Sequence, residues 1–337
     1  MPVTLDEIAK QVGFSKATVA RAMKNDRLIH PETRSLVLEA AARAGYERSA
    51  KRGRRVSKGQ PRIFFLLPPH SQTPTNLDFQ LYLGGLTRGA DEADCFLSVG
   101  TIGAENVGKI SKRRHLPLEI RDGAADVVVT AYKHEYTDIH AISKILPIVS
   151  LQWDYRDIPM DVVSAFNSQG MFTMVGRLAA RGHQRLAWVG GGYEASFFSD
   201  RHAGFIKGCL DRGLEIVPEN QYKSAAQLAE PGVLKKLLAR GITGVVCAND
   251  RAAVLVSQAA EAKGIRIPED LSLAGFDAGA EPTAGGKVIS SYDPAISELG
   301  RTAVHAVMQR LRDPGAPRLV YMREGRVEEG ETIFKIG

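Results

Sequence analysis

The chain has 337 residues, of which 44% are hydrophobic, so it is long enough for more than one domain with a substantial core. Cys95, Cys209 and Cys247 are far apart, which argues against a disulfide framework or a cysteine zinc site. The eight histidines show no metal-ligand spacing, so we expect no metal and no cofactor. No stretch approaches about 18 apolar residues and no apolar signal segment stands at the N-terminus, which predicts a cytoplasmic protein without a membrane partner.

The positive charge is concentrated in the first 60 residues. They contain thirteen Lys and Arg against six Asp and Glu, a net charge of +7, whereas the whole chain carries +6. Residues 61–337 therefore carry a net charge of only −1. A basic segment attached to a nearly neutral body is typical of a protein that contacts the phosphates of a nucleic acid.

The first predicted helix has both start and stop signals. Thr4 and Glu7 form a capping box, in which each side chain accepts a hydrogen bond from the backbone amide of the other residue. Gly13 ends the helix, because glycine adopts the left-handed conformation at a helix terminus without strain. The expected apolar face of this helix consists of Leu5, Ile8, Ala9 and Val12.

Two further helices follow within the first 46 residues. Ser15 caps a second helix that runs from Lys16 to Lys24, and Pro31 stands at the first position of a third helix that ends at residues 45–46. This arrangement predicts a helix-turn-helix. Another small three-helix module is the alternative, and the charge favours DNA binding. The expected buried residues are Ala17, Val19, Ala20 and Met23, or a subset of these, in the second helix, and Val37, Leu38, Ala41 and Ala42 in the third.

Residues 47–60 (ERSAKRGRRVSKGQ) form a basic linker with six cations, one anion and two glycines. Such a composition is typical of a solvated, flexible connection. On DNA the same segment could order against the phosphate backbone or in the minor groove. Both interpretations hold at this point.

From residue 61 onward, short apolar segments alternate with helical ones. The expected strands are 63–67, 95–99, 126–130 and 148–151, and then 186–189, 244–248 and 271–274. The expected helices span about 79–93, 171–181, 201–212 and 251–263. Buried strands that alternate with helices predict parallel sheets covered on both faces.

Two such series predict two similar doubly wound lobes, so the fold class is an all-α head joined to an α/β body. Ligands of such sheets lie beyond the carboxyl ends of the strands, where polar residues become candidate binding residues. The expected domains are the head at 1–46, the linker at 47–60 and the body at 61–337. The first lobe is expected at about 61–164 plus 293–320, and the second at about 165–292 plus 321–337.

Several segments of the chain resemble, in the same order, the segments of one known protein family. They are VTLDEIAKQVGFSKATVARAMKN at 3–25, HPETRSLVLEAAARAGY at 30–46, LAARGHQRLAWVGG at 178–191, GVVCANDRAAVLVSQAAEAKGIRIPEDLSLAGFD at 244–277 and ISELGRTAVHAVMQRL at 296–311. In this order they resemble the LacI/GalR family of bacterial transcriptional regulators, over nearly the whole chain. The resemblance implies a body similar to the two-lobed periplasmic sugar-binding proteins.

The resemblance also places the second helix of the head in the major groove. It implies that Lys16, Ala17 and Arg21 read base edges. Arg21 suits the O6 and N7 atoms of guanine, whereas Ala17 offers only a methyl group. The residues that it places near phosphates are Thr4, Ser15, Thr18, Lys24 and Thr33. For Thr4 and Ser15, simple helix capping is an equally good interpretation.

The linker departs from the family's pattern. In relatives this segment forms a short hinge helix on dimerisation, and a leucine wedges into the central minor-groove step. Here the corresponding residues are 50–56, with Gly53 inside them and only the small Val56 as a wedge, so we expect weak helix formation and shallow DNA bending. The expected DNA contacts of the linker are Arg52, Arg54, Arg55 and Val56, the arginines through a narrow minor groove.

The family's effector contacts correspond to Asn76 and Phe79 in the first lobe and to Arg201, Asn249 and Asp277 in the second. Arginine and carboxylate side chains suit vicinal hydroxyls, and an aromatic face stacks on a sugar ring. Sugar-binding relatives often have an acidic residue where this chain has Gln152, so a nucleoside or another small polar metabolite stays open beside a sugar. The further candidates for an aromatic wall are Trp153, Phe197 and Phe198.

The expected function is a DNA-binding transcriptional regulator, a repressor by preference, that is controlled by a small polar metabolite, with a sugar or sugar derivative as first candidate. Its expected partners are a pseudo-palindromic double-stranded DNA operator, the effector and a second copy of the chain. An enzyme with a DNA-binding head would need a nucleophile–base pair or a phosphate loop, and neither is found. A solute-binding receptor is disfavoured by the head and by the missing signal segment. No leucine heptad follows the body, so nothing predicts a tetramer.

Overall fold

The computed structural model describes residues 4–23, 29–44, 59–69, 77–191, 195–279 and 281–336. The chain divides into two compact units, Met1–Arg55 and Val56–Gly337, and each is described by itself. Six predicted site residues lie outside the described ranges, namely Lys24, Arg52, Arg54, Arg55, Val56 and Asn76. Within those ranges, no helix has the length and apolar character needed to cross a membrane.

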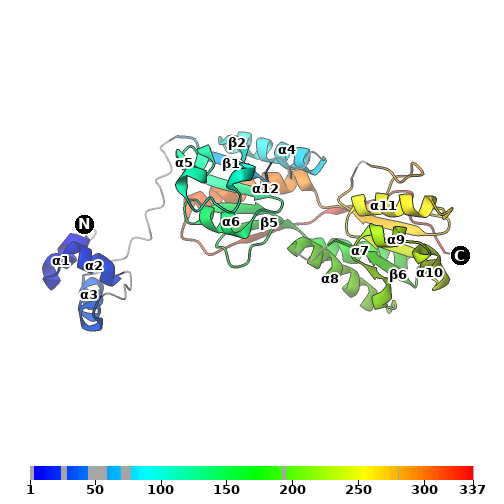
Figure 1. The fold of residues 1–337 in the computed structure, drawn as a ribbon, viewed down its shortest axis with the longest axis horizontal. Helices are drawn as coiled ribbons and strands as arrows, with labels where there is room; N and C mark the ends of the chain where they lie inside the picture. The colour runs from blue at the N-terminus through cyan, green and yellow to red at the C-terminus, as the bar shows by residue number, and fades with distance from the viewer. Residues whose placement is uncertain are drawn as a thin grey trace. The chain divides into compact units, whose positions relative to one another are not determined.

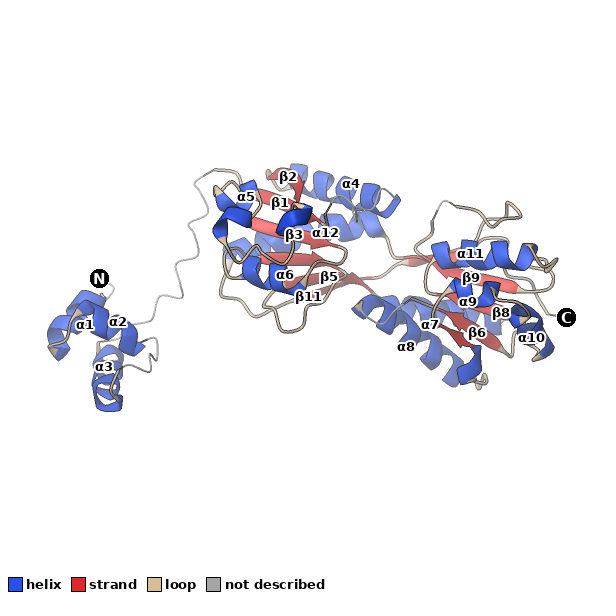
Figure 2. Cartoon of the chain, in the orientation of Figure 1, coloured by secondary structure: helices blue, strands red, loops and turns tan. Residues whose placement is uncertain are grey.

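The first unit is a three-helix head (Figures 1 and 2). Its helices are α1 (Leu5–Val12), α2 (Lys16–Met23) and α3 (Pro31–Arg43). The three helices share one core, made of Ile8, Ala9, Val19, Ala22, Val37, Ala40 and Ala41. The predicted helix order and the predicted apolar face of α1 are therefore confirmed.

The buried faces of α2 and α3 differ from the prediction. Ala22 and Ala40 are buried, whereas Ala17, Leu38 and Ala42 are exposed. Short helices contain so few large apolar residues that several faces fit the same pattern. The packing of the three helices against one another selects the face that is buried.

The first lobe of the second unit contains a six-stranded parallel sheet in the order β11-β5-β4-β3-β1-β2. Its strands are β1 (Arg62–Leu67), β2 (Phe96–Thr101), β3 (Val127–Ala131), β4 (Ile148–Leu151), β5 (Asp161–Ala165) and β11 (Val320–Arg323). Alternate residues of β1 face two separate cores: Ile63 and Phe65 pack with α4 (Leu77–Glu92) and α12 (Ile296–Arg312). Phe64 and Leu66 pack on the opposite face, which is covered by α5 (Leu118–Arg121) and α6 (Tyr136–Ser143).

The second lobe repeats this plan with the sheet order β12-β10-β9-β8-β6-β7. Its strands are β6 (Leu186–Val189), β7 (Gln221–Tyr222), β8 (Gly244–Cys247), β9 (Ser272–Phe276), β10 (Ser290–Asp293) and β12 (Arg326–Glu328), and only the pair β10–β12 is antiparallel. One face is covered by α7 (Asn167–Ala179) and α8 (Ser196–Leu210). The other face is covered by α9 (Ala225–Ala229), α10 (Val233–Ala239) and α11 (Asp250–Glu261) (Figure 2). The predicted α/β class with two parallel-sheet lobes is confirmed.

Three segments of chain connect the two lobes. They join β5 to α7, β10 to α12 and β11 to β12. The first and third of these crossovers are linked directly, because the Phe166 amide donates a hydrogen bond to the Arg323 carbonyl at 2.9 Å. The two lobes are thus connected by three crossover segments, two of which are hydrogen-bonded to each other.

The position of β11 corrects the expected boundary between the lobes. Residues 321–337 were assigned to the second lobe, but Val320–Arg323 pairs with β5 in the sheet of the first lobe. The chain therefore returns to the second lobe only after Arg323. The sequence of β11, VYMR, is mostly exposed at the edge of the sheet and has no alternation of buried residues that would indicate its partner strand.

Candidate functional site

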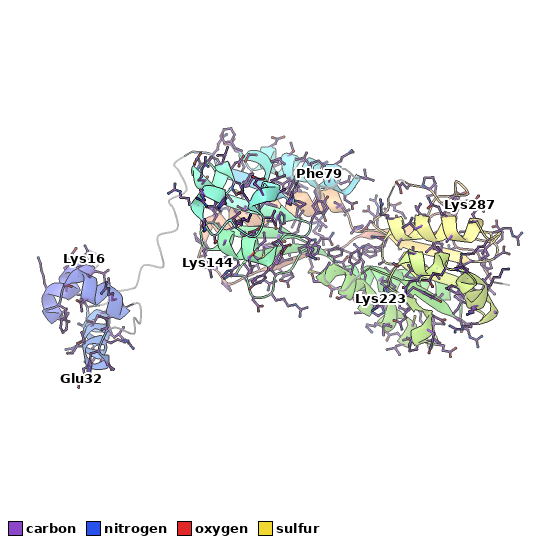
Figure 3. The ribbon with its side chains drawn as sticks, in the orientation of Figure 1. Lys16, Glu32, Phe79, Lys144, Lys223 and Lys287 are labelled. Carbon is purple, nitrogen blue, oxygen red and sulfur yellow. The ribbon has the colours of Figure 1, made fainter. Side chains whose placement is uncertain are left out.

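The second helix of the head presents a polar surface. Lys16, Ala17 and Arg21 are all exposed on α2, and Lys16 is labelled in Figure 3. The Lys16 Nζ atom lies 2.6 Å from Asp6 Oδ2, in a pair in which both side chains are more than half exposed. Such an exposed pair is weak, so Lys16 can exchange Asp6 for another anion at little cost.

The hydroxyl side chains of the head act as helix caps. Thr4 and Glu7 form the predicted capping box, with the Thr4 amide donating to Glu7 Oε2 at 2.7 Å. Ser15 Oγ accepts from the Thr18 amide at 3.1 Å and bonds the Thr18 hydroxyl at 2.9 Å. Thr33 is half-buried in the first turn of α3. The capping interpretation of Thr4 and Ser15 is confirmed, while their phosphate contacts stay predictions.

In the body, Arg201 is the centre of the predicted effector site. Its side chain is only 2% exposed, although it carries a full positive charge. Nη2 donates to Asp277 Oδ1 at 2.8 Å and Nη1 to the Ala248 carbonyl at 2.7 Å, while Nε donates to Asn167 Oδ1 at 2.9 Å. The guanidinium also lies 3.7 Å from the ring centre of Phe276. A buried charge of this kind is stable only because nearly all of its donors are used.

Three residues directly after parallel strands have left-handed backbone angles. Tyr132 follows β3 with φ 66°, Gln152 follows β4 with φ 64° and Asp277 follows β9 with φ 98°. Non-glycine residues in this region cost roughly 1–3 kcal/mol each and gather at ligand sites. The strain supports a binding site at the carboxyl ends of these strands.

An aromatic cluster lies beside the arginine. The Trp153 ring, from the first lobe, is 5.8 Å from that of Phe197, from the second lobe, and Phe197 is 4.5 Å from Phe198. The Arg201 guanidinium lies 5.4 Å from the Phe197 ring centre and 5.8 Å from that of Phe198. The structure therefore brings together Arg201, Asp277 and the predicted aromatic candidates, apart from Phe79.

The other predicted effector residues have partners inside the protein. Gln152 is buried, and its Nε2 donates to Tyr82 Oη at 2.8 Å. Asn249 caps α11, because its Oδ1 accepts from the Ala252 amide at 2.9 Å. Phe79, labelled in Figure 3, lies on α4 and packs against the core of the first lobe. Their effector contacts stay predictions.

Sequence reasoning did not find Asn167, Tyr82, Tyr132 or Asp250. Asn167 follows β5, a strand that was not predicted, so its place at a strand end was hidden. The Tyr132 hydroxyl is buried and has no hydrogen-bond partner among the described residues. An unsatisfied buried hydroxyl costs about 1–3 kcal/mol, which makes Tyr132 a further candidate for contact with a ligand.

Asp250 holds the loop that carries Asp277. Its Oδ2 accepts from the Gly279 amide at 2.6 Å and its Oδ1 from the Ser291 hydroxyl at 2.8 Å. Burial, together with the nearby Asp277 carboxylate, raises the pKa of Asp250 to about 7, although the hydrogen bonds that its carboxylate accepts act to lower it. The loop is thus fixed by a carboxyl group that resists ionisation.

This raised pKa predicts a pH dependence. The stabilisation from protonated Asp250 is fully present below about pH 4 and is lost as the pH rises through about 7. We expect Asp250 by itself to lower the free energy of unfolding by about 2 kcal/mol between pH 5 and 8, and Asp250→Asn to remove most of that contribution. His134 acts in the opposite direction over part of this range, because burial lowers its pKa to about 4, so the variant is compared with the parent at each pH. Urea unfolding at both pH values measures the difference. The control is Asp270→Asn, since the Arg266 side chain lowers the pKa of Asp270 to about 2, outside this window. Equal pH dependence in parent and Asp250→Asn would contradict the prediction.

A cavity of about 530 Å³ touches Asp277. It is lined from the first lobe by Leu77, Leu81 and the start of α12, and from the second by residues 277–279 and 288–289 and by Arg326 and Glu328 of β12. Asp293 and Ala295, at the second crossover, complete it. This volume is typical of a pocket for one small organic ligand.

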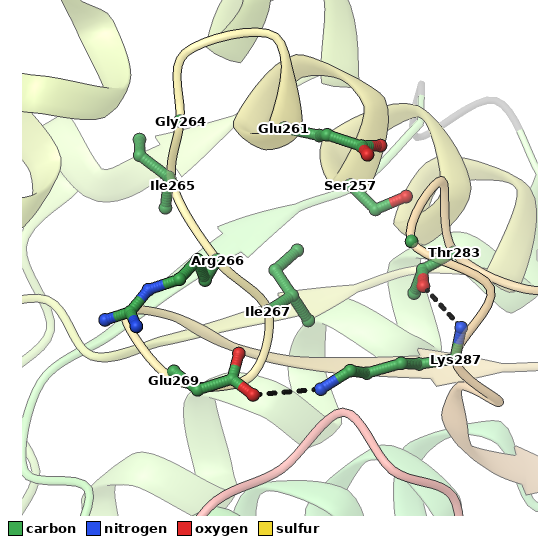
Figure 4. Close-up of a pocket in the computed structure, with 10 residues that line it drawn as sticks. Ser257, Glu261, Gly264, Ile265, Arg266, Ile267, Glu269, Thr283 and Lys287 are labelled. Carbon is green, nitrogen blue, oxygen red and sulfur yellow. Dashed lines mark hydrogen bonds and ion pairs between the residues drawn. The ribbon is translucent and has the colours of Figure 1, made fainter.

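Another cavity, of about 420 Å³, lies at the end of α11 in the second lobe (Figure 4). Its cations are already paired: Lys287 Nζ lies 3.0 Å from Glu269 Oε1, and Arg266 lies 2.6 Å from Asp270. None of the predicted effector residues lines it. In the parts of the chain that the structure describes, no group of three or more His, Cys, Asp or Glu could hold a metal ion.

Known protein families match the head and the body of this chain separately. Residues 4–49 match the model of the bacterial regulatory proteins of the lacI family, and residues 175–333 match the periplasmic binding protein-like domain. The chain belongs to the LacI family. It carries the DNA-binding head of this family and a periplasmic binding protein-like body, and its curated relatives are transcriptional repressors rather than enzymes.

Two curated relatives align with nearly the whole of this LacI-family chain. The HTH-type transcriptional repressor PurR of Pasteurella multocida is 25% identical, with 94% of each chain covered. The ribose operon repressor of Haemophilus influenzae is also 25% identical, with 99% of each chain covered.

Solved structures share the fold. A transcriptional regulator CelR–cellobiose complex matches with a TM-score of 0.66 and 18% identity, over 98% of this chain and 99% of the other. The lac repressor dimer bound to operator and an anti-inducer matches with a TM-score of 0.64 and 19% identity, over 99% and 100%. At these identities the likeness supports the fold alone.

Proposed function

We propose that this LacI-family chain represses transcription from an operator, and that a small polar metabolite bound beside Arg201 and Asp277 sets its operator affinity. The buried Arg201–Asp277 pair carries the proposal, because it stands at strand ends next to a cavity lined by both lobes. A sugar or sugar derivative is the preferred effector class. Asp277 retains 19% exposure of its side chain, so one face of its carboxylate is open to hydroxyl donors.

A nucleoside is the second candidate. The aromatic cluster of Trp153, Phe197 and Phe198 offers faces on which a planar base would stack. Gln152 does not supply a carboxylate to the site, and its amide is engaged with Tyr82. A ribose group would satisfy Asp277 in either case, since ribose occurs both as a free sugar and within a nucleoside.

A thermal-shift screen with ribose, ribose 5-phosphate, cellobiose and adenosine tests the effector. A ligand at about 100 times its Kd stabilises the folded state by about 2.7 kcal/mol. We expect one of these probes to raise the melting temperature and to change operator affinity, and Asp277→Ala to lose both responses. Asp211→Ala, which removes a carboxylate from the far end of α8, is the control. Unchanged responses in Asp277→Ala would place the effector elsewhere.

We propose that the head reads DNA with the exposed residues of α2. Arg21→Ala should cost about 1–3 kcal/mol of operator affinity and relax the preference at one base pair per half-site. Arg43→Ala, which removes the same charge from the end of α3, should cause a smaller loss on every sequence. Gel-shift titration of operator and single-base variants distinguishes them. Equal, sequence-independent losses in both variants would refute the assignment.

We also propose that two copies bind a pseudo-palindromic operator, with half-sites about one helical turn apart. The lac repressor structure that shares this fold is a dimer on its operator. In this chain, the edge strand β2 leaves Phe96 61% and Val99 42% exposed, which suits an apolar contact with a second copy. Sedimentation of the operator complex counts the chains, and one chain per operator would exclude the dimer.

A further inference from the structure

Asn167 stands where the chain first crosses between the lobes. It is the first residue of α7 and follows β5 by two residues. Its neighbour Phe166 bonds the Arg323 carbonyl, so two of the three crossovers meet at this point. The Asn167 side chain is only 1% exposed. Any movement of one lobe relative to the other must be accommodated close to this residue.

Both ends of the Asn167 amide are engaged, and they face different lobes. Oδ1 accepts from Arg201 Nε at 2.9 Å, on α8 of the second lobe. Nδ2 donates to the Ala165 carbonyl at 3.1 Å and lies 3.3 Å from Ser164 Oγ and 3.4 Å from Gln152 Oε1, all in the first lobe. An amide is planar and rigid, so a displacement of the arginine at one end is transmitted to the other.

The series continues into the first lobe. The Gln152 side-chain amide donates to Tyr82 Oη at 2.8 Å. The Gln152 backbone carbonyl accepts from the hydroxyl of Ser196, at the start of α8, at 3.3 Å. Tyr82 lies on α4, which packs closely against α12, the helix that follows the second crossover. Tyr82, Gln152, Asn167 and Arg201 are all buried. In so dry an environment each hydrogen bond is strong, and breaking one is costly.

We propose that Asn167 is a positioning residue, through which occupancy of the Arg201–Asp277 site changes the closure of the two lobes. The inference rests on the proposed function only in taking this pair as the effector site. A ligand that draws the Arg201 guanidinium toward the cleft would weaken its bond to Asn167. The ligand would thereby alter the contacts of Asn167 with Ala165 and Gln152, and so favour one closure over the other.

Trp153 supplies a reporter of lobe closure that needs no effector. It follows Gln152 in the first lobe, and its ring contacts Phe197 of the second lobe at 5.8 Å. The chain has two tryptophans, and the other, Trp188, is buried inside the second lobe. In a Trp188→Phe parent, the emission wavelength and acrylamide quenching of Trp153 therefore report whether the lobes stay in contact.

Asn167→Asp separates the acceptor role of the Asn167 amide from its donor role. The carboxylate still accepts from Arg201 but has no N–H to donate to the first lobe. We expect its Trp153 emission to shift to longer wavelength and its quenching constant to rise, and Asn167→Ala to behave alike. Tyr82→Phe, which removes one hydroxyl without creating a cavity, should shift emission less and in the same direction. If the Asn167 variants do not fold, the Trp153 emission of Tyr82→Phe tests the proposal instead.

Asn220→Asp is the matched control. Asn220 is also buried and accepts from an arginine, Arg240, at 3.2 Å, but it lies away from the crossovers. Its variant should keep the parent emission. If the Asn167 variants melt at lower temperature yet keep the parent emission and quenching, Asn167 serves only to satisfy Arg201, and the proposal is wrong. Because this measurement uses no ligand, its outcome is independent of whether any probe in the effector screen binds.

Discussion

Replacing Arg201 by alanine should lower the free energy of unfolding by about 3–5 kcal/mol, because it breaks a buried ion pair from one side. The change leaves the Asp277 carboxylate, the Asn167 amide oxygen and the Ala248 carbonyl without their common donor. It also removes the cation that lies on the Phe276 ring. The effector response should be lost in the same variant, since the site loses its organising charge.

Urea unfolding of Arg201→Ala, of a control, and of a double variant with its two single variants tests this expectation. Arg266→Ala is the control: its pair with Asp270 is as close, at 2.6 Å, but the Arg266 side chain is 68% exposed. An exposed pair contributes at most about 1 kcal/mol, so this variant should be nearly as stable as the parent. The double variant Arg201→Met with Asp277→Asn should lose less than the sum of the single losses. A loss in Arg201→Ala no larger than that in Arg266→Ala would contradict the interpretation of the pair as a buried brace.

Replacing either of two neighbouring glycines of α4 by alanine should change the free energy of unfolding, but in opposite directions. Gly85 lies where α4 crosses α12, and a Cβ atom there would stand 1.9 Å from the Ser297 carbonyl oxygen. Because the obstacle is backbone, Gly85→Ala should cost about 1–3 kcal/mol or more. Gly84 is exposed and a Cβ there would have nothing within 4 Å, so Gly84→Ala should stabilise the helix by about 0.5–1 kcal/mol.

The two variants control for each other, since both add one methyl group to the same helix. Thermal and urea unfolding should rank Gly84→Ala above the parent and Gly85→Ala well below it. Similar stabilities for both would show that α4 and α12 can separate without cost. The signal from Trp153 should also change in Gly85→Ala, because Tyr82 lies one turn away on α4.

Much of the fold was predictable because its signals are local. The capping box of Thr4 and Glu7 and the left-handed Gly13 depend on residues within one or two turns of one another. The buried strands β1, β3, β4 and β8 are continuous apolar segments, so their burial on both faces could be predicted from composition. Two of the strands that were missed have different sequences: Ser290–Asp293 is polar, and Val320–Arg323 lies at an exposed edge. Only their sheet partners make them strands.

The site shows the same division. Arg201 and Asp277 were predicted from a family resemblance and are bonded to each other, 76 residues apart in the sequence. Gln152 was predicted to face the effector, yet its amide lies between Tyr82 and Asn167, a pairing that links residues 70 and 15 positions away. Asn167 escaped prediction because nothing in its neighbourhood indicates that a buried arginine will need an acceptor there.

By itself, then, the sequence determined the helices of the head, many of the buried strands and helices of the body, the basic charge of the head, the α/β class and the residue types at the ends of the strands. These follow from short-range hydrogen bonding, charge and the burial of apolar side chains, which act over a few residues. The tertiary structure alone decided which face of α2 and α3 is buried, where β11 pairs, and which partners Arg201 and Gln152 bond. Those outcomes depend on contacts between segments far apart in the chain, where a buried donor or acceptor takes whichever partner packing places within about 3 Å.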